Sequence, residues 1–221
     1  MRSQPLTKKR AGILISGRGS NMMALVEAAS APNFPAEIVI VISNRPEAAG
    51  LTWARRQGLV TEAIDHKAFA RREDFEAQVH RALTHAQVDL VCCAGFMRLM
   101  TAGFVEQWHG RMLNIHPSLL PAFKGLHTHE RALAAGVKIA GCTVHFVVPE
   151  MDSGPIVAQA AVPVLDGDTP DSLAARILAA EHKLYPHALR LVAAGAARLE
   201  GGGVILSEAV SRGETLFSPS V

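Results

Sequence analysis

An asparagine and a histidine stand two residues apart in the segment Asn114-Ile115-His116-Pro117. The lead 111–113 predicts a strand, and side chains at positions i and i+2 of a strand point to the same face. Pro117 has no backbone N–H and should end this strand, which places His116 at its carboxyl end. Open parallel sheets bind their ligands at that end, so the pair favours chemistry on a bound ligand. Taken alone, the segment also fits a plain polar strand end.

Asp152 is a second group that could serve such chemistry. It lies in the turn-rich stretch 149–154, between two alternating apolar runs. Its carboxylate could pair with His116, orient the imidazole and favour the protonated ring, although a loop aspartate considered alone is more often a turn former. An Asn, a His and an Asp without a nucleophile suit acyl transfer between bound substrates. The amine of one substrate would attack, Asn114 and His116 would stabilise the oxyanion, and the His116/Asp152 pair would handle protons.

Other polar groups fit chemistry less well. Ser118 has no strand-turn-helix setting and the chain has no G-x-S-x-G elbow, so nucleophilic serine chemistry is disfavoured. The segment 127–130 is not H-E-x-x-H, and two histidines at i and i+2 do not share a helix face, so no metal site is expected. Thr143 and His145 share a strand face, and His145 is interpreted as a structural histidine.

The turn Ser16-Gly17-Arg18-Gly19-Ser20-Asn21 follows the first predicted strand. Glycines let the backbone approach a ligand, and the helix N-terminus that follows offers free N–H groups and a partial positive charge. We interpret Gly19, Ser20 and Asn21 as a phosphate cradle; the alternative is a plain βα turn. Because the turn has neither the spacing G-x-G-x-x-G nor the lysine of a P-loop, it favours a single phosphate over a dinucleotide.

Apolar runs alternate with helical patterns along the first half of the chain, which predicts βαβ units and a parallel sheet. The expected strands are 11–15, 37–43, 59–64, 88–94 and the strand of Asn114, and the expected helices are 21–30, 46–57, 71–85 and 101–108. Two longer alternating runs, 138–148 and 155–164, predict an antiparallel pair. A last long helix should open at 168–170, followed by a hairpin after Leu199 and a polar end that frays.

At 221 residues the chain fits one large domain or one domain with a small appendage, and we expect a single domain over 1–221. The chain is 49% hydrophobic and 19% charged, which is enough for a core and excludes disorder. No run of eighteen uncharged apolar residues occurs, so no membrane span is expected, and the apolar run after the basic start is too short for a signal peptide. A net charge of +2 without a basic block does not indicate nucleic-acid binding. Small anionic ligands fit this charge.

Three cysteines, Cys92, Cys93 and Cys142, lie in apolar runs without zinc spacing or a disulfide framework. We interpret them as small buried hydrophobic residues of a protein in the reducing cytoplasm.

In the segments that carry Asn114, His116, Asp152 and the turn at Gly19, the chain resembles the phosphoribosylglycinamide formyltransferases, a branch of the folate-dependent formyltransferase superfamily. The matching stretches are ILISGRGSN (13–21), AGFMRLM (94–100), RMLNIHPSLLPAFKGLHTH (111–129), TVHFVVPEMDSGPIVAQAAVPV (143–164) and EHKLYPHAL (181–189). The run N-I-H-P-S-L-L-P with a downstream Asp-x-Gly-Pro is specific to the superfamily. The G-S-N turn points to the glycinamide ribonucleotide branch.

The resemblance implies an α/β, Rossmann-like formyltransferase fold with a mostly parallel twisted sheet and an antiparallel C-terminal portion. It implies formyl transfer from 10-formyltetrahydrofolate to the amine of glycinamide ribonucleotide in de novo purine biosynthesis. The single domain would divide into a ribonucleotide-phosphate half (about 8–108), a catalytic and folate half (about 109–200) and a tail (201–221). The expected partners are these small molecules, with no metal, nucleic acid or membrane, for a monomer or homodimer in the cytoplasm.

Carried over by position, the resemblance makes Asn114, His116 and Asp152 the catalytic trio. Gly19, Ser20 and Asn21 would bind the ribonucleotide phosphate, and Glu181 would contact the ribose. The folate pocket would be lined by two segments and one arginine, namely Met97, Arg98, Leu99, Met100, Val148, Pro149, Glu150, Met151 and Arg72. Two positions depart from the pattern: Arg18 stands where a small or neutral residue is expected, and Ser153 replaces a usual glycine.

Three alternatives stay open at this point. A transformylase for another amine, such as methionyl-tRNA or an amino-sugar nucleotide, would share this core; the methionyl-tRNA enzymes carry a further C-terminal domain, and only a short tail follows the last predicted helix here. A formyltetrahydrofolate hydrolase is expected to carry an extra N-terminal domain. A non-catalytic nucleotide-binding module is disfavoured by the intact Asn/His/Asp set.

Overall fold

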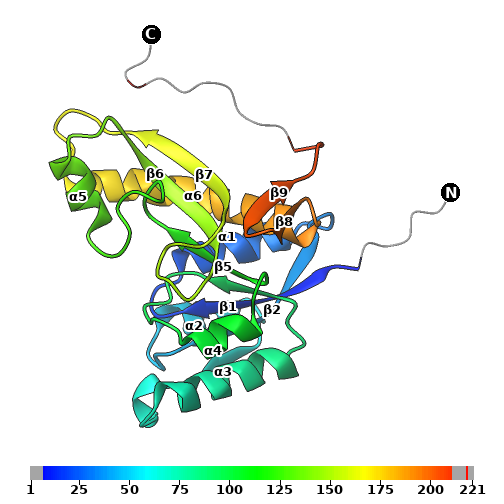
Figure 1. Cartoon of the computed structure of the whole chain (residues 1–221). Coiled ribbons are helices and arrows are strands. Elements are labelled where there is room, and N and C mark those ends of the chain that lie inside the picture. Colours follow the sequence, from blue (N-terminus) through cyan, green and yellow to red (C-terminus); the bar gives the residue numbers. More distant parts are fainter. Residues whose placement is uncertain (1–6, 211–217, 219–221) are drawn as a thin grey trace.

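A seven-stranded sheet lies at the centre of the protein (Figure 1), in a computed structural model that describes residues 7–210 and 218. The strand order is β3-β2-β1-β4-β5-β6-β7. In chain order the strands are β1 (Lys9–Ile15), β2 (Ala36–Ser43), β3 (Thr61–Ala63), β4 (Leu90–Cys93), β5 (Met112–His116), β6 (Ile139–Phe146) and β7 (Ile156–Pro163).

The sheet changes direction at β5. The first five strands pair in parallel, whereas β6 pairs antiparallel to β5 and β7 antiparallel to β6. This confirms the predicted mostly parallel sheet with an antiparallel C-terminal portion. Because the parallel strands share one direction, the carboxyl ends of β1, β4 and β5 meet at one edge.

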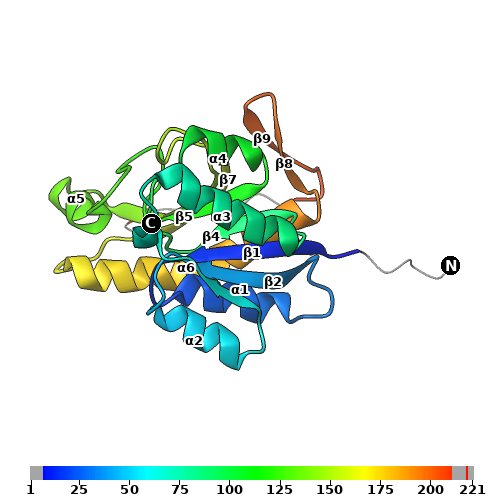
Figure 2. The same ribbon diagram turned by 90° about the horizontal axis from the view of Figure 1, so that it is seen from below.

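Helices cover both faces of the sheet. They are α1 (Ser20–Ala29), α2 (Ala49–Arg56), α3 (Arg72–His85), α4 (Ala102–Gln107), α5 (Thr128–Ala134) and α6 (Pro170–Ala193), with a short 3-10 turn η1 (His66–Ala68). Buried residues of α1, α2 and α6 join one core cluster, and those of α3 and α4 join the other. Figure 2 shows these two groups on opposite sides of β1. Adjacent residues of β1 serve the two cores in turn, since Ile13 and Ile15 pack on one side and Leu14 on the other.

The long helix α6 is fixed across the middle of the sheet. Its start is closed by a capping box, in which the side chains of Thr169 and Ser172 each accept from the other's backbone N–H. Further along, the buried Tyr185 hydroxyl lies 3.1 Å from the carbonyl oxygens of Cys93 and Leu113 and can donate to either. The helix is thereby attached to β4 and β5, the two strands that lead to the predicted site.

Local hydrogen bonds move some boundaries away from the predicted ones. Helix α2 begins later than expected because Ala48 N–H donates to the Arg45 carbonyl (3.1 Å) and closes a turn first. Strand β4 begins later because Val88 N–H donates to the Leu83 carbonyl (3.0 Å) at the end of α3. Helix α5 was not predicted. The expected hairpin is present as β8 (Ala197–Glu200) and β9 (Gly203–Leu206), whereas most of the end expected to fray lies outside the described residues.

The three cysteines are buried, free thiols, as predicted. Burial raises the pKa of Cys92 and of Cys142 to about 12, so both remain protonated near neutral pH. Burial likewise raises the pKa of Cys93 far above its usual range. Within the described residues, none of the helices combines the length and the apolar character that crossing a bilayer requires.

Candidate active site

Strand β5 presents Asn114 and His116 to one cavity of about 750 Å³. The strand ends at His116, as Pro117 predicted. Asp152 reaches the same cavity from the loop between β6 and β7. The structure therefore brings together all three residues that the sequence singled out for catalysis.

His116 lies between a carboxylate and a carbonyl. Its Nδ1 is 3.4 Å from Oδ2 of Asp152, and its Nε2 donates to the Phe123 carbonyl at 3.1 Å. Both side chains of the pair are largely buried, with exposed fractions of 8% and 12%. A protonated imidazole would satisfy both neighbours, since only that form carries an N–H on each nitrogen.

The conformation of the β6–β7 loop places the Asp152 carboxylate beside His116. Asp152 has a φ of 49°, in the left-handed region that aspartate tolerates better than most residues. Its Oδ2 accepts the Gly125 N–H at 2.9 Å. At Gly154 a Cβ atom would collide with the Phe146 carbonyl oxygen, so the loop can return only with glycine there. The Asp-x-Gly-Pro pattern is thus a packing requirement of the loop that holds the carboxylate.

His145, interpreted from the sequence as structural, lies beside Asn114 in the site. Its Nδ1 is 2.9 Å from the Phe146 carbonyl, which can only accept, so Nδ1 carries the proton. The bare Nε2 then accepts from the Asn114 amide at 3.3 Å. Burial lowers the pKa of His145, against a smaller raising effect of the Phe146 hydrogen bond, which favours the neutral ring. The histidine therefore orients the amide of Asn114.

Strand register, and not a motif, places His145 there. In the antiparallel pair β5·β6, Asn114 is opposite His145 and His116 is opposite Thr143. The shared face of Thr143 and His145 was visible in the sequence, but the partner strand and its register were not.

Apolar side chains form much of the cavity wall. Met97, Leu99, Leu126 and Met151 are large apolar residues with at least half of their surface exposed, and all four line the cavity. Of the residues predicted for the folate, those that line it are Met97, Arg98, Leu99, Met100, Val148, Pro149 and Met151. Exposed methionine and leucine side chains around an opening are typical of a site for a flat apolar ligand.

Two of the predicted folate residues are not among the lining residues. Glu150 lies 3.6 Å from Lys124 in an ion pair, with 78% of its side chain exposed. Arg72 is exposed at the first position of α3. Their role in folate binding stays a prediction.

The turn before α1 has the geometry expected of a phosphate cradle. Gly19 caps the helix with a φ of 72°, a conformation that favours glycine. The N–H groups of the first helical turn, from Ser20 onward, have no partner within the helix. The turn follows β1, and β4 alone separates β1 from β5, so the two strands lie about 10 Å apart at the sheet edge.

Asn21 and Glu181 meet behind this turn. The Asn21 amide donates to Glu181 at 2.7 Å, and both side chains are buried. Burial raises the pKa of Glu181, while the bond from Asn21 acts in the opposite direction. The oxygen of the Asn21 amide is buried and has no hydrogen-bond partner among the described residues. It is an acceptor that a bound ligand could satisfy.

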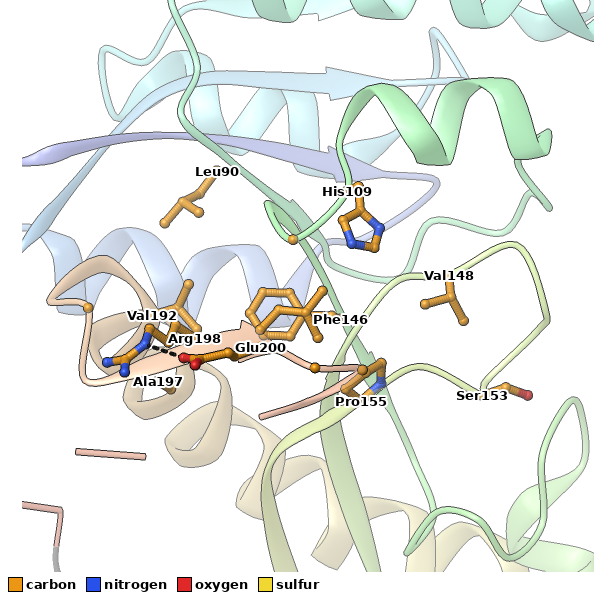
Figure 3. Close-up of a pocket in the computed structure, with 15 residues that line it drawn as sticks. Leu90, His109, Phe146, Val148, Ser153, Pro155, Val192, Ala197, Arg198 and Glu200 are labelled. Atoms are coloured by element: carbon orange, nitrogen blue, oxygen red, sulfur yellow. Dashed lines mark hydrogen bonds and ion pairs between the residues drawn. The ribbon is translucent and has the colours of Figure 1, made fainter. Parts of the chain in front are cut away.

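A second cavity of about 750 Å³ lies between the β8–β9 hairpin and the β6–β7 loop. Figure 3 shows apolar side chains such as Phe146, Pro155 and Ala197 on its walls. Arg198 and Glu200 also line it, and they pair with each other at 3.0 Å. Because its charges are matched and no set of polar groups converges in it, this cavity is a weaker candidate for chemistry than the one at the end of β5.

In the described part of the chain, no group of three or more His, Cys, Asp or Glu side chains gathers as metal ligands would.

Known proteins resemble this chain over most of its length. Residues 9–189 match the family described as formyl transferase. The chain is 50% identical over 198 residues to the trifunctional purine biosynthetic protein adenosine-3 of Homo sapiens, an alignment that covers 90% of this chain and 20% of that protein. The chain thus spans about a fifth of the length of these trifunctional relatives.

Shorter relatives match over most of their own length. The phosphoribosylglycinamide formyltransferase of Escherichia coli (strain K12) is 42% identical over 174 residues, which covers 79% of this chain and 82% of that protein. The crystal structure of phosphoribosylglycinamide formyltransferase from Brucella melitensis superposes with a TM-score of 0.82 at 57% identity, over 85% of this chain and 97% of that one.

Proposed function

The chain belongs to the formyl transferase family, and we propose that it transfers the formyl group of 10-formyltetrahydrofolate to the amine of glycinamide ribonucleotide. The products are the N-formyl ribonucleotide and tetrahydrofolate, in a step of de novo purine biosynthesis. The Escherichia coli and Brucella melitensis relatives carry the name of this activity. The observation that carries the proposal is the meeting of Asn114, His116 and Asp152 at one cavity.

The reaction begins when the substrate amine attacks the formyl carbon. A C–N bond forms, and the carbonyl electrons move onto the oxygen, which becomes an oxyanion. The positive charge of a protonated His116 and an N–H of Asn114 stabilise that oxyanion. Because one Asn114 N–H donates to His145, the amide orientation is fixed before substrate binds. The second N–H of the amide is left for the oxyanion.

The intermediate then collapses and the bond from the formyl carbon to the folate nitrogen breaks. The attacking amine must lose a proton, and the departing nitrogen must gain one. The His116/Asp152 pair relays this proton, since the carboxylate holds the imidazole 3.4 Å away and stabilises its charged form. No external oxidant, reductant or metal takes part in this balance.

The ribonucleotide binds at the turn before α1. Its phosphate accepts from the free N–H groups of Gly19, Ser20 and Asn21, where the helix dipole also favours an anion. Glu181 accepts from a ribose hydroxyl, and the unpartnered oxygen of Asn21 supplies a second acceptor. The ligand then reaches across β4 to Asn114 and His116.

The folate binds against the segments 97–100 and 148–151. Its ring packs on the exposed apolar side chains, and Arg98, which lines the cavity, binds the negatively charged glutamate tail. Arg72, at the start of α3 outside this lining, supplies a second positive charge for the tail. Glu150 belongs to the second of these folate-binding segments.

The two halves of the chain, about 8–108 and about 109–200, act as one domain. The protein works in the cytoplasm as a monomer or homodimer, and its partners are small molecules.

An acceptor-dependence assay tests this function. Purified protein is supplied with 10-formyltetrahydrofolate and with glycinamide ribonucleotide, its dephosphorylated form, or water alone. We expect tetrahydrofolate release that requires the ribonucleotide and falls sharply without the phosphate. Equal release with water alone would indicate a hydrolase, and turnover only with another amine would overturn the assigned acceptor.

A further inference from the structure

One wall of the active-site cavity is held at both ends by buried side chains. The wall is the segment 96–100, all of which lines the cavity. Near its start, the Met97 N–H donates to the Ser16 hydroxyl at 2.7 Å. Just after its end, the N–H and the hydroxyl of Thr101 both donate to the carboxylate of Glu76, the former at 2.8 Å. The position of the wall therefore depends on two residues outside it.

Ser16 is buried, and both its side chain and its backbone N–H make hydrogen bonds. It is 4% exposed and is the first residue after β1. Its hydroxyl accepts from Met97 and donates to Oδ1 of Asn44 at 2.6 Å, while its backbone N–H donates to the Gly95 carbonyl at 3.1 Å. One side-chain oxygen thus joins β1, the residue after β2 and the cavity wall.

Asn44, the acceptor of the Ser16 hydroxyl, is held by a further hydrogen bond. It is 2% exposed, and its carbonyl accepts from Nδ1 of His66 at 2.8 Å. A displacement of Ser16 would leave a buried polar partner without its hydrogen bond, which is unfavourable, so motions of Ser16 and of its partners are linked.

The same serine begins the turn that is suited to a phosphate. The next residue, Gly17, accepts from the Gly50 N–H at 3.1 Å, and the cradle at Gly19 follows two positions later. A ligand that orders this turn also restrains Ser16, and through its hydroxyl the Met97 amide. The wall then has less conformational freedom left to lose when the second ligand binds.

We propose that Ser16 is a positioning residue that couples the two substrate sites, so that each substrate strengthens binding of the other. This inference rests on the proposed function, because it takes the turn as the ribonucleotide site and the wall as part of the folate site. By thermodynamic linkage the strengthening factor is the same in both directions.

Glu76 provides a matched control. It holds the far end of the same wall but belongs to α3 and makes no hydrogen bond to the turn in the described structure. Glu76→Gln keeps an acceptor of similar shape and weakens the bonds to Thr101. It loosens the wall without touching the connection through Ser16.

Calorimetry of a binding cycle tests the proposal. The dissociation constant of glycinamide ribonucleotide is measured with and without saturating tetrahydrofolate, for the wild type, Ser16→Ala and Glu76→Gln. We expect the wild-type ratio to be about fivefold or more, and to fall close to one in Ser16→Ala. In Glu76→Gln, tetrahydrofolate should bind more weakly with the ratio preserved. A wild-type ratio of one, or the same ratio in wild type and Ser16→Ala, would overturn the coupling alone. Absence of binding of both ligands to the wild type would instead overturn the proposed function, and the coupling with it.

A second measurement does not depend on the folding of a variant. In the wild-type protein, adding glycinamide ribonucleotide without folate should slow hydrogen exchange of the Met97 amide. An exchange rate that does not change at saturating ribonucleotide would contradict the coupling.

Discussion

The amide of Asn21 donates a hydrogen bond of 2.7 Å to the carboxylate of Glu181, which lies 160 positions later in the chain. The bond joins the first turn of α1 to the middle of α6. It places a carboxyl group that is only 6% exposed directly behind the turn suited to a phosphate. Burial raises the pKa of Glu181, so the ionised form is disfavoured in the folded protein compared with the unfolded chain.

Glu181→Gln should raise stability at high pH and weaken ribonucleotide binding. Because the folded pKa of Glu181 is raised, its protonated form stabilises the fold at low pH, and this contribution is lost as pH rises through the raised pKa. The variant has no such loss, so its melting temperature should exceed that of the wild type above the raised pKa, and the gap should close on acidification. Scanning calorimetry across this range checks the effect, and a gap independent of pH would contradict it.

The same variant should increase KM for the ribonucleotide about tenfold or more, since a hydrogen bond to a charged group contributes about 1.5–3 kcal/mol. Steady-state kinetics with each substrate varied separately measure this. The KM for the folate should stay within about twofold, because Glu181 does not line the cavity at the end of β5.

His116→Ala should lower kcat about 100-fold to 1000-fold with little change in either KM, because it removes an interaction made chiefly in the transition state. Steady-state kinetics check both parameters. His109→Ala is a matched control, since His109 lines the second cavity and should leave kcat unchanged (Figure 3). Turnover of His116→Ala at the control's level would remove the basis of the proposed mechanism.

Asp152→Asn should move the basic limb of the pH–rate profile, where the protonated imidazole is lost, to lower pH, and it should lower kcat at least about tenfold. The amide keeps an oxygen for the Gly125 N–H but removes the negative charge 3.4 Å from the His116 imidazole, so the imidazolium is destabilised. The profile of kcat against pH, recorded for both proteins, measures the displacement. Superimposable limbs would show that the pair does not share a proton.

His145→Gln should make stability less sensitive to acid. Burial lowers the pKa of His145, so its neutral form contributes stability above the ordinary histidine pKa, and this is lost as pH falls through the lowered value. Urea unfolding near neutral pH and near pH 5 should therefore show a smaller fall for the variant. Its kcat should also decrease, since the amide of Asn114 loses the partner that orients it. An equal loss of stability in both proteins would contradict the assigned protonation.

Lys124→Met should reduce kcat only a few-fold. The Lys124 ammonium donates to the Ser153 hydroxyl at 2.5 Å, which connects the loop after β5 to the loop that carries Asp152. Partly exposed interactions of this kind contribute about 0–1 kcal/mol. Because Ser153→Gly removes the same bond, the double variant should be no slower than either single variant, and additive losses in kcat would exclude the connection.

The features predicted from the sequence are those fixed by short-range geometry. Asn114 and His116 share a face because strand side chains repeat every two residues, and Pro117 ends the strand because it lacks a donor. The left-handed turn at Gly19, whose role as a phosphate cradle stays a prediction, follows from the backbone freedom of glycine after β1. Each of these depends on a few consecutive residues, and the structure confirms their placement.

The features that were missed depend on contacts between distant segments. The role of His145 requires the register of β5 against β6, and the Ser16–Met97 bond spans 81 positions. Helix α5 is short, and only two of its residues, Thr128 and Ala132, are buried. So short a segment gives too weak a helical period to be recognised from the sequence.

The position of β4 between β1 and β5 has an evolutionary consequence. The turn proposed to bind the acceptor follows β1, and the residues proposed for the chemistry lie on β5, so the two are encoded by strands that are not neighbours in the sheet. A descendant of this protein could acquire a different acceptor by changing residues 17–21 while Asn114 and His116 keep their places. If the proposed coupling holds, the Ser16 hydroxyl would limit such divergence, because it joins the turn to the Met97 amide of the cavity wall.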